Sequence, residues 1–346
     1  MNLTGIGAAG AERINMSSSD DVRADTARIK ERRCAICGGA FREYREVYDD
    51  RYGYPGSFQL VTCLQCGHKL LVGEFTPELL KKLYTDYYPR STFDLGRYRP
   101  SPGVKGFTAW LNGERRSAYC WVPVNSRVLD IGCGFGETLG YHKARGCDVY
   151  GVEADENIRR VAEKFGFKVH VGLFDPDNYE PDFFDYVTLD QVIEHMTNPL
   201  ETMRGMFKVL KPGGTAIVST PNATGWGARL FGRRWINWHA PYHLQHFSLA
   251  SLTLAARQAG FSVEKVKTIT SSEWLYYQWI HLCTYPDRGK PSPFWSTSAV
   301  RSVKVQMIFG ILTLVHWTKI NHIITRFFDA LGMGDNFLFF LRKNVR

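Results

Sequence analysis

A glycine-rich turn in the middle of the chain constrains the fold more than any other feature. Residues 128–136 read Val-Leu-Asp-Ile-Gly-Cys-Gly-Phe-Gly, a short apolar strand followed by three glycines at alternating positions. Glycine accepts positive φ and leaves room for a ligand beside the backbone, and the helix that follows offers unpaired N–H groups. The pattern therefore predicts a nucleotide-binding turn between a strand and a helix.

The spacing of these glycines separates two classes of ligand. A dinucleotide fingerprint reads G-x-G-x-x-G and rests a pyrophosphate on the helix N-terminus, but here Gly136 comes one residue early and Glu137 follows it. A carboxylate there opposes a pyrophosphate and tolerates S-adenosylmethionine, which carries a sulfonium and an ammonium group and no phosphate. Asp130 suits the same cation. Glu153 ends the next apolar run, about twenty positions after the glycines, where a carboxylate can accept both ribose hydroxyls.

Further blocks follow the turn at residues 184–199, 210–214 and 218–222. In this order, the blocks and the turn resemble the class I S-adenosylmethionine-dependent methyltransferases. The resemblance implies an α/β fold with a doubly wound, seven-stranded, Rossmann-like sheet and S-adenosylmethionine as cofactor. A doubly wound sheet without a cofactor is the alternative. The predicted cofactor-binding residues are Asp130, Gly132, Gly134, Gly136, Glu153, Phe174 and Asp190.

Four of the eight cysteines form two C-x-x-C-G pairs, which predict a metal site. Two thiolates in one tight turn can reach the same ion, and two such turns complete a tetrahedral set with Zn–S bonds of about 2.3 Å. In a reducing compartment this spacing favours zinc over disulfides. Redox chemistry and chance turns are the alternatives, and His68 could replace a thiolate. The predicted ligands of this structural zinc are Cys34, Cys37, Cys63 and Cys66.

The order of apolar runs and turn residues predicts the domain layout. Strands are expected near residues 127–131, 148–153, 168–171, 185–189, 214–219, 262–270 and 336–341, with helical segments between most of them. A helix that starts at Thr76 and one from Ser248 to Gly260 carry clear cap residues. The predicted parts are a disordered lead-in (1–28), a zinc ribbon (29–75), a helical linker and substrate wall (76–125), the methyltransferase domain (126–272), a helical cap insertion (273–335) and the last strand with a tail (336–346).

The charge and the apolar segments of the chain indicate which partners and which compartment can be expected. The net charge is +9, and much of the excess lies after residue 285. A basic surface can meet nucleic acid, anionic lipid or a phosphorylated substrate, or can be only a solvated face. No secretory signal and no run of roughly 18 apolar residues is recognised, so a cytoplasmic protein is expected. The apolar insertion suggests a helical cap with a peripheral membrane face, and packing against the sheet's own helices is its alternative.

The chemistry is expected beyond the carboxyl ends of the strands, where residues 190–195 overhang the transferred methyl group. Methyl transfer needs an aligned nucleophile and, for a hydroxyl, a base; His195 suits the role because histidine titrates near neutrality. Glu194 either orients His195 or acts as the base, and His243 is a second candidate in the block 235–248. The alternative is a Glu-His pair that only caps the next turn.

The Glu-His pair also resembles that of ubiquinone-pathway O-methyltransferases and of zinc-ribbon-bearing sugar C-methyltransferases. In the former such residues can hold a divalent cation, although this chain does not show the complete set. The resemblance implies an acceptor that is a small molecule, a sugar or a lipid-linked glycan, as in polysaccharide biosynthesis. An RNA methyltransferase is the alternative, but residues 190–193 lack the Asn-Pro-Pro-Tyr type of motif and nucleic acid is not expected as a partner. A non-catalytic membrane-surface protein is a third reading. The sequence predicts neither the methylated atom nor the oligomeric state.

Overall fold

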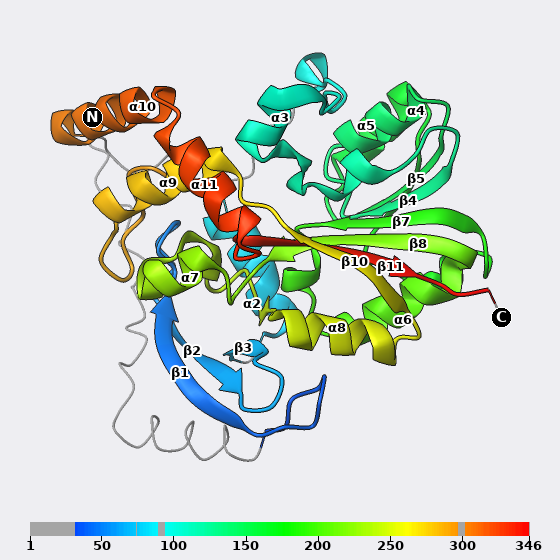
Figure 1. The fold of residues 1–346 in the computed structure, drawn as a ribbon, viewed down its shortest axis with the longest axis horizontal. Helices are drawn as coiled ribbons and strands as arrows, with labels where there is room; N and C mark the ends of the chain where they lie inside the picture. Colours follow the sequence, from blue (N-terminus) through cyan, green and yellow to red (C-terminus); the bar gives the residue numbers. More distant parts are fainter. Residues whose placement is uncertain (1–31, 74, 89–93, 297–301, 346) are drawn as a thin grey trace, which may run out of the picture.

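The computed structural model describes residues 32–73, 75–88, 94–296 and 302–345 (Figure 1). The predicted lead-in at 1–28 lies outside the described residues, and so does the segment 89–93 of the predicted substrate wall.

A seven-stranded, mainly parallel sheet forms the centre of the molecule, as predicted. Its order is β10-β11-β8-β7-β4-β5-β6, so the chain leaves β4 toward one edge and returns at β7 on the other side. Only β11 runs antiparallel to both of its neighbours, β8 and β10. The strands are β4 (Arg127–Ile131), β5 (Asp148–Glu153), β6 (Lys168–Val171), β7 (Phe184–Asp190), β8 (Leu210–Pro221), β10 (Ser262–Thr268) and β11 (Asn336–Arg342).

Helices cover both faces of this sheet, α4 (Glu137–Lys143) and α5 (Ile158–Phe165) on one and α6 (Pro199–Val209) and α8 (Leu249–Gln258) on the other (Figure 1). Each face has its own apolar core, with Leu139, Ile158 and Val161 in the first and Met203, Met206 and Leu252 in the second. The predicted caps of α8 are present: Ser248 accepts a hydrogen bond from the backbone N–H of Ser251, and Gly260 has a φ of +100°.

The N-terminal part is a small antiparallel sheet that is joined to the main body by backbone hydrogen bonds. It contains β1 (Phe41–Tyr48), β2 (Ser57–Cys63) and β3 (Lys69–Val72), and β3 pairs with β9 (Gln245–His246) of the methyltransferase part. The helix α2 (Pro77–Lys82) follows, with Thr76 as its N-cap as predicted, and a π-helical turn continues it over Leu83–Tyr87. The register between β3 and β9 therefore fixes where the cysteine turns lie.

Short helices connect the larger elements. They are α3 (Gly106–Asn112), α7 (Trp226–Leu230) and the 3₁₀ turns Leu95–Arg97, Glu114–Arg116, Ala118–Trp121, Pro176–Asn178, Ile193–His195, Gly232–Arg234 and Ile236–Trp238. The turns at Glu114–Arg116 and Ala118–Trp121 lead directly into β4, and Ile193–His195 follows β7. The turns before β4 fold back to the carboxyl ends of β7 and β8, because the N–H of Ala118 bonds to Asp190 and the hydroxyl of Ser219 bonds to the carbonyl of Arg116. Both regions therefore lie at the edge where a doubly wound sheet binds its ligands.

The insertion before the last strand is helical. It contains α9 (Ser272–Cys283), α10 (Val303–Trp317) and α11 (Ile320–Ala330). Helix α10 projects at the edge of the molecule, and α11 runs from it toward the start of β11 (Figure 1). In the described part of the chain no individual helix has both the length and the hydropathy of a membrane span. Taken together, α10 and α11 satisfy that test, with a bend of 61° between them.

Candidate active site

The glycine turn at the end of β4 leaves open space beside the backbone. Gly132, Gly134 and Gly136 have φ values of +76°, +56° and +79°, a region that L side chains avoid. A Cβ added at Gly132 would meet Val192 at 2.5 Å, whereas one at Gly134 would find no atom within 4 Å. Gly134 is therefore the position at which a ligand can approach the main chain most closely, and it stays a predicted cofactor residue.

Asp130 lies beneath this turn and ties it to its neighbours. Its carboxylate accepts hydrogen bonds from the hydroxyls of Thr138, in α4, and Thr188, in β7, the latter at 2.7 Å. Burial raises the pKa of Asp130 to about 6. The structure thus gives Asp130 a positioning role that the sequence did not indicate, while its contact with a sulfonium or ammonium group stays a prediction.

Glu153 at the end of β5 is held against the same turn. Its Oε2 accepts the backbone N–H of Gly134 at 2.9 Å, and its Oε1 accepts that of Asp155 at 2.9 Å. A carboxylate oxygen has further lone pairs beyond one such bond, so both oxygens can still accept hydroxyl protons. The geometry fits the predicted tether for a ribose, because the backbone that leaves room at Gly134 also fixes this carboxylate.

The other two predicted cofactor residues lie on different sides of this region. Asp190, at the end of β7, accepts the backbone N–H of Ala118 at 3.2 Å and so links the 3₁₀ turn before β4 to the central strands. Phe174 stacks on Tyr179 with ring centroids 6.4 Å apart and packs over α6, where a Cβ on Gly205 would lie 2.9 Å from its ring. Asp190 is thus at the expected edge, while Phe174 belongs to the packing of α6 and its contact with a cofactor stays a prediction.

A cavity of about 210 Å³ opens beside the end of β7. Its walls come from the ribbon, the β7 edge, the block 231–243, α9 and the start of β11, and among the lining residues are Arg51, Arg116, Gln191, Glu194, His239 and Trp274. His195 and His243 also line it. The sequence analysis placed Glu194, His195 and His243 in one reaction, and the structure brings all three to this cavity.

These three side chains converge closely. Their potential ligand atoms lie within 4.8 Å of one another, and the rings of His195 and His243 are nearly perpendicular with centroids 4.7 Å apart. The Nδ1 of His195 lies 2.9 Å from the carbonyl oxygen of Tyr242, and the Nδ1 of His243 lies 2.9 Å from that of Asn237. A carbonyl only accepts, so each Nδ1 carries the proton and each Nε2 keeps a lone pair.

The electrostatics of the cluster follow from its burial. Oε2 of Glu194 accepts the hydroxyl of Thr220 at 2.9 Å, while Oε1 is buried and has no hydrogen-bond partner within the described residues. Burial raises the pKa of Glu194 to about 8 and lowers that of His195 to about 4. At neutral pH both imidazoles are therefore neutral and Glu194 retains its proton. The pKa of His195 lies below the near-neutral value expected from the sequence, so its free Nε2 is a weaker proton acceptor than predicted.

The same donor set also fits a divalent cation. A carboxylate oxygen without a partner and two imidazole nitrogens with free lone pairs are ligands that divalent transition metals accept. Glu194, His195 and His243 would hold such an ion, which would lower the pKa of a hydroxyl bound to it.

The four cysteines of the ribbon form the second candidate metal centre. The Sγ atoms of Cys34 and Cys66 lie 3.7 Å apart, those of Cys37 and Cys63 lie 3.3 Å apart, and all four lie within 4.8 Å of one another. The hydrogen bond from Cys66 lowers the pKa of Cys34 to about 5. This arrangement fits a tetrahedral sulfur site.

His68, which the sequence left open as a substitute ligand, is turned away from the cysteines. It is buried, and its Nε2 lies 2.8 Å from Oε1 of Gln245 in β9. It therefore joins the ribbon to the methyltransferase part.

Sequence reasoning missed three residues of the site. Arg116 lines the cavity with its guanidinium carbon 5.8 Å from the ring centroid of Trp274. Burial raises the pKa of Asp190, and the positive charge of Arg116 opposes that rise. Gln191 takes a φ of +58° and donates to Ser219 and Asn336 at 2.8 and 2.7 Å. The hydroxyl of Tyr84 lies 3.4 Å from Nδ1 of His195. Tyr84 and Arg116 lie within the predicted substrate wall (76–125), and Gln191 lies within the segment 190–195 expected beside the transferred methyl group, but the sequence singled out none of them individually.

Comparison with known proteins agrees with this geometry. Residues 108–266 match the methyltransferase domain family. The chain is 28% identical over 157 residues to a ubiquinone biosynthesis O-methyltransferase of Thiobacillus denitrificans, covering 42% of this chain and 68% of that protein. It is 31% identical over 120 residues to the protein of that name from Azoarcus sp., covering 33% of this chain and only 49% of that protein.

Solved structures with similar folds include an S-adenosylmethionine-dependent methyltransferase from Archaeoglobus fulgidus, with a TM-score of 0.39, 20% identity and coverage of 63% of this chain and 86% of that one. Another is a phosphoethanolamine-type N-methyltransferase from Haemonchus contortus, with a TM-score of 0.46, 17% identity and coverage of 94% and 74%. The assignment does not depend on these two likenesses, because the sheet order, the glycine turn and the sequence matches carry it. Residues 108–266 are therefore a class I S-adenosylmethionine-dependent methyltransferase domain, and the chain is similar in sequence to the ubiquinone biosynthesis O-methyltransferases.

Proposed function

We propose that this enzyme transfers a methyl group from S-adenosylmethionine to a hydroxyl oxygen of an acceptor that enters the 210 Å³ cavity. The observation that carries the proposal is the convergence of Glu194, His195 and His243 on that cavity, within 4.8 Å of one another. Their two free Nε2 lone pairs suit the removal of a proton from an oxygen nucleophile. The name shared by the similar curated proteins, ubiquinone biosynthesis O-methyltransferase, supports oxygen as the methylated atom.

The cofactor lies, in this proposal, along the turn at residues 132–136 with its ribose on Glu153. The turn is open at Gly134, and Glu153 is already fixed by the N–H of that residue. Arg116 is the proposed partner of the carboxylate of the methionine moiety, because it is a cation that lines the cavity. The sulfonium methyl then points across the end of β7 toward Glu194 and His195.

The chemical step is an in-line displacement at carbon. The acceptor oxygen forms the new O–C bond while the C–S bond breaks, and S-adenosylhomocysteine leaves with the electron pair. Nε2 of His195 takes the hydroxyl proton, because its Nδ1 is already committed to the carbonyl of Tyr242. Glu194 positions this imidazole and His243 supports the same proton-accepting cluster.

The walls of the cavity favour a small ring-shaped acceptor. Tyr88, His239 and Trp274 provide flat surfaces, and Tyr84 and Tyr242 extend the aromatic wall with centroids 5.5 Å apart. Aromatic faces stack on phenolic rings and on the apolar faces of sugars. The acceptor classes proposed are therefore a phenol, a sugar or the terminal sugar of a lipid-linked glycan.

We further propose that the four cysteines hold one structural zinc ion. The donor set and the sulfur distances of 3.3 and 3.7 Å support this assignment. Through the β3–β9 pairing the ion would hold the ribbon against the block that contains His243 and His246. Its role is then to position the acceptor wall, and it takes no part in methyl transfer.

The test uses S-adenosylmethionine with a radioactive methyl group. The full chain is incubated with a simple catechol, with nucleotide sugars, with a lipid-linked saccharide extract and with total RNA, and the labelled product is then treated with alkali to distinguish ethers from esters. We expect label in one of the first three acceptors, as an alkali-stable ether. Label only in RNA, or in none of the four while S-adenosylmethionine still binds, would contradict the proposal.

A further inference from the structure

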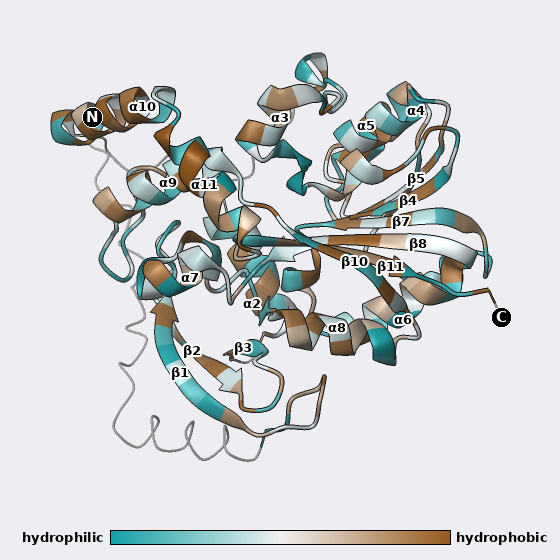
Figure 2. Cartoon of the chain, in the orientation of Figure 1, coloured by the Kyte–Doolittle hydropathy of each residue, from teal (hydrophilic) through white to brown (hydrophobic). Residues whose placement is uncertain are grey.

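We infer that α10 and α11 form a docking surface for an anionic lipid bilayer, a property that goes beyond the proposed reaction. Ten of the nineteen large apolar side chains that are exposed in the described residues fall within residues 303–331. We name these ten the apolar helix face: Val303, Met307, Ile311, Leu314, Val315, Trp317, Ile320, Ile323, Phe327 and Leu331. Figure 2 shows the corresponding hydrophobic bands on both helices.

The spacing of the apolar helix face follows the helix period. Val303, Met307, Ile311 and Leu314 recur every three or four residues along one side of α10. The opposite side of α10 packs inward, where Phe309 contacts Phe294 with ring centroids 5.6 Å apart. A helix that is apolar on both sides and keeps none of its fifteen residues fully buried leaves one side for another partner.

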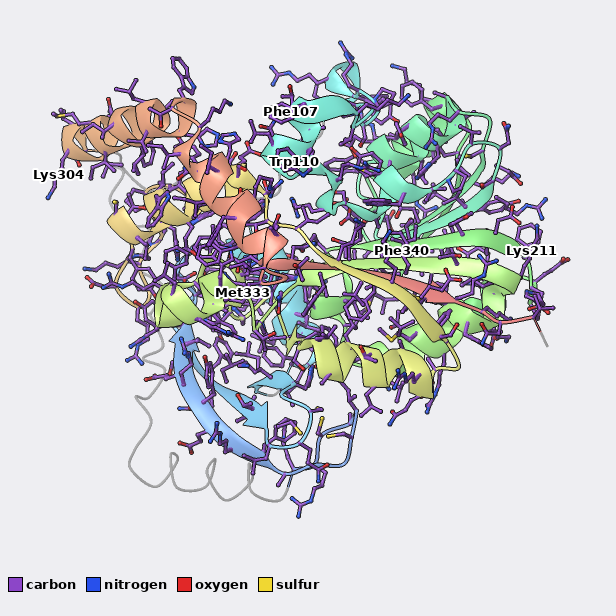
Figure 3. The ribbon with its side chains drawn as sticks, in the orientation of Figure 1. Phe107, Trp110, Lys211, Lys304, Met333 and Phe340 are labelled. Atoms are coloured by element: carbon purple, nitrogen blue, oxygen red, sulfur yellow. The ribbon has the colours of Figure 1, made fainter. Side chains whose placement is uncertain are left out.

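Charge identifies that partner. Residues 288–328 contain six basic residues and no Asp or Glu. Three of the six, Arg288, Lys290 and Arg326, pair with Glu46, Asp287 and Asp329. Lys304 and Lys319 flank α10, and neither forms an ion pair with a carboxylate in the described part of the chain; Lys304 projects from the outer end of the helix (Figure 3). A second copy of this chain would bring the same positive charge against itself, whereas anionic lipid headgroups complement it.

A pair of exposed aromatic side chains on α3 extends the surface. Phe107 and Trp110 on α3 are exposed at 70% and 52% (Figure 3), and the guanidinium of Arg326 in α11 bonds to the carbonyl of Trp110. Trp110 therefore lies next to the basic side chain of Arg326, and Trp317 is the last residue of α10, two positions before Lys319. Tryptophan and lysine at the edge of an apolar helical surface are typical of helices that lie in the membrane interface.

The docking surface is directly coupled to the catalytic cavity through α9. Tyr276 bonds to Thr313 of α10 at 2.8 Å, and Trp279 donates to Asn321 of α11 at 3.0 Å. On its other side α9 presents Trp274, Leu275 and Gln278 to the cavity. A bilayer that holds α10 and α11 would thus lie one helix away from the site of methyl transfer.

The experiment is flotation of the full chain with vesicles. Wild type is mixed with vesicles of phosphatidylcholine alone or with an equal share of phosphatidylglycerol, at low and high salt. We expect binding to the anionic vesicles that weakens at high salt, and a loss of roughly tenfold or more in the double variant Ile311→Glu/Ile323→Glu. The double variant Lys304→Glu/Lys319→Glu should also lose binding.

The matched control is Val124→Glu. Val124 is exposed at 54%, similar to Ile311 at 61%, but it lies just before β4, at the amino ends of the parallel strands. The control should bind vesicles as wild type does, and every variant should keep its circular dichroism spectrum and its affinity for S-adenosylmethionine. The inference is overturned if wild type does not float with anionic vesicles, or if Ile311→Glu/Ile323→Glu binds equally well.

Sedimentation velocity tests whether a second copy of the chain, and not a bilayer, covers the apolar helix face. If wild type is a dimer that the double variant Ile311→Glu/Ile323→Glu converts to monomer, a second copy covers the apolar helix face and the membrane assignment is wrong. Neither result alters the labelling experiment with soluble acceptors, so the docking surface and the proposed reaction fail independently.

Discussion

The cofactor side and the acceptor side of this enzyme are built in different ways. The cofactor residues from Asp130 to Glu153 are close in sequence, and their geometry depends on backbone conformation at three glycines. The acceptor cavity draws its walls from Arg51 to Asn336 and depends on buried side chains with shifted pKa values. In the proposed function, a local motif would therefore hold the cofactor, whereas the acceptor would be held by segments that only the complete fold brings together.

The two sides also respond differently to substitution. On the cofactor side, a new side chain occupies space that the backbone leaves open. On the acceptor side, removal of a side chain changes the protonation and hydrogen bonding of a buried cluster. We expect the largest effect at the cofactor turn, a smaller one at the histidine cluster, and the smallest at the cysteine cluster and at His142.

Gly134→Arg should lower the affinity for S-adenosylmethionine roughly 1000-fold or more, because the side chain fills the open space at the turn and places a cation beside the sulfonium site. Titration calorimetry measures this affinity. The control is Gly332→Arg, since Gly332 has a similar φ of +70° and also has no atom within 4 Å of an added Cβ. If both variants bind the cofactor as tightly as wild type, the ligand does not lie at Gly134.

His195→Ala should slow turnover by roughly 100-fold and leave cofactor affinity unchanged, because the cluster loses the Nε2 that takes the proton. Single-turnover kinetics with labelled cofactor measure the chemical step directly. His243→Ala should have a smaller effect of the same kind. A turnover rate in His195→Ala equal to that of wild type would exclude His195 as the base. A fall in cofactor affinity would instead indicate that His195 contributes to cofactor binding.

Cys63→Ser should reduce bound zinc from about one ion per chain to roughly a tenth of that value, because an incomplete sulfur set binds zinc weakly. Metal analysis of the purified protein checks this stoichiometry. Cys283→Ser serves as the control, since Cys283 is exposed and lies in α9, outside the ribbon. Zinc content that is the same in both variants, or absent from wild type, would show that the ribbon does not need the ion.

Acid should destabilise the fold through buried neutral histidines. His142 is fully buried, its ring nitrogens have no hydrogen-bond partner in the described residues, and burial lowers its pKa from 6.5 to about 4. Below pH 6.5 His142 binds a proton in the unfolded chain, whereas in the folded chain it binds one only near pH 4. The free energy of unfolding is therefore highest above pH 6.5 and decreases as the pH falls below that value.

Between pH 7 and pH 5 this one residue should lower the free energy of unfolding by about 2 kcal/mol. His142→Leu should remove that part of the pH dependence, which urea titrations at the two pH values measure. A pH dependence that is identical in wild type and variant would show that His142 is not a source of the acid sensitivity.

The sequence predicted the central sheet well because its signals are local. The strands expected at 127–131, 148–153 and 168–171 have the observed bounds. The strand expected at 214–219 is longer, Leu210–Pro221, since β8 pairs with β7 from Leu210 and with β11 as far as Pro221. The cysteine cluster was predicted for a similar reason, because each pair encodes its own turn. Ser248 and Gly260 bound α8 through equally local cap chemistry.

The acceptor side was predicted only in part. Glu194 and His195 were found because they directly follow β7, but the position of Arg116 in the cavity depends on how the turns before β4 fold back against Asp190. His68 illustrates the limit from the other side: its spacing from Cys66 left a ligand role open, and its hydrogen bond to Gln245 arises only from the distant pairing of β3 with β9. No local pattern encodes either contact.

A crystal structure of the full chain soaked with S-adenosylhomocysteine tests the central claim most directly. The account predicts that the ligand lies along residues 132–136, with its ribose hydroxyls on Glu153 and its sulfur directed across the end of β7 toward Glu194 and His195. A ligand bound elsewhere, or one at the turn whose sulfur points away from the 210 Å³ cavity, would contradict it.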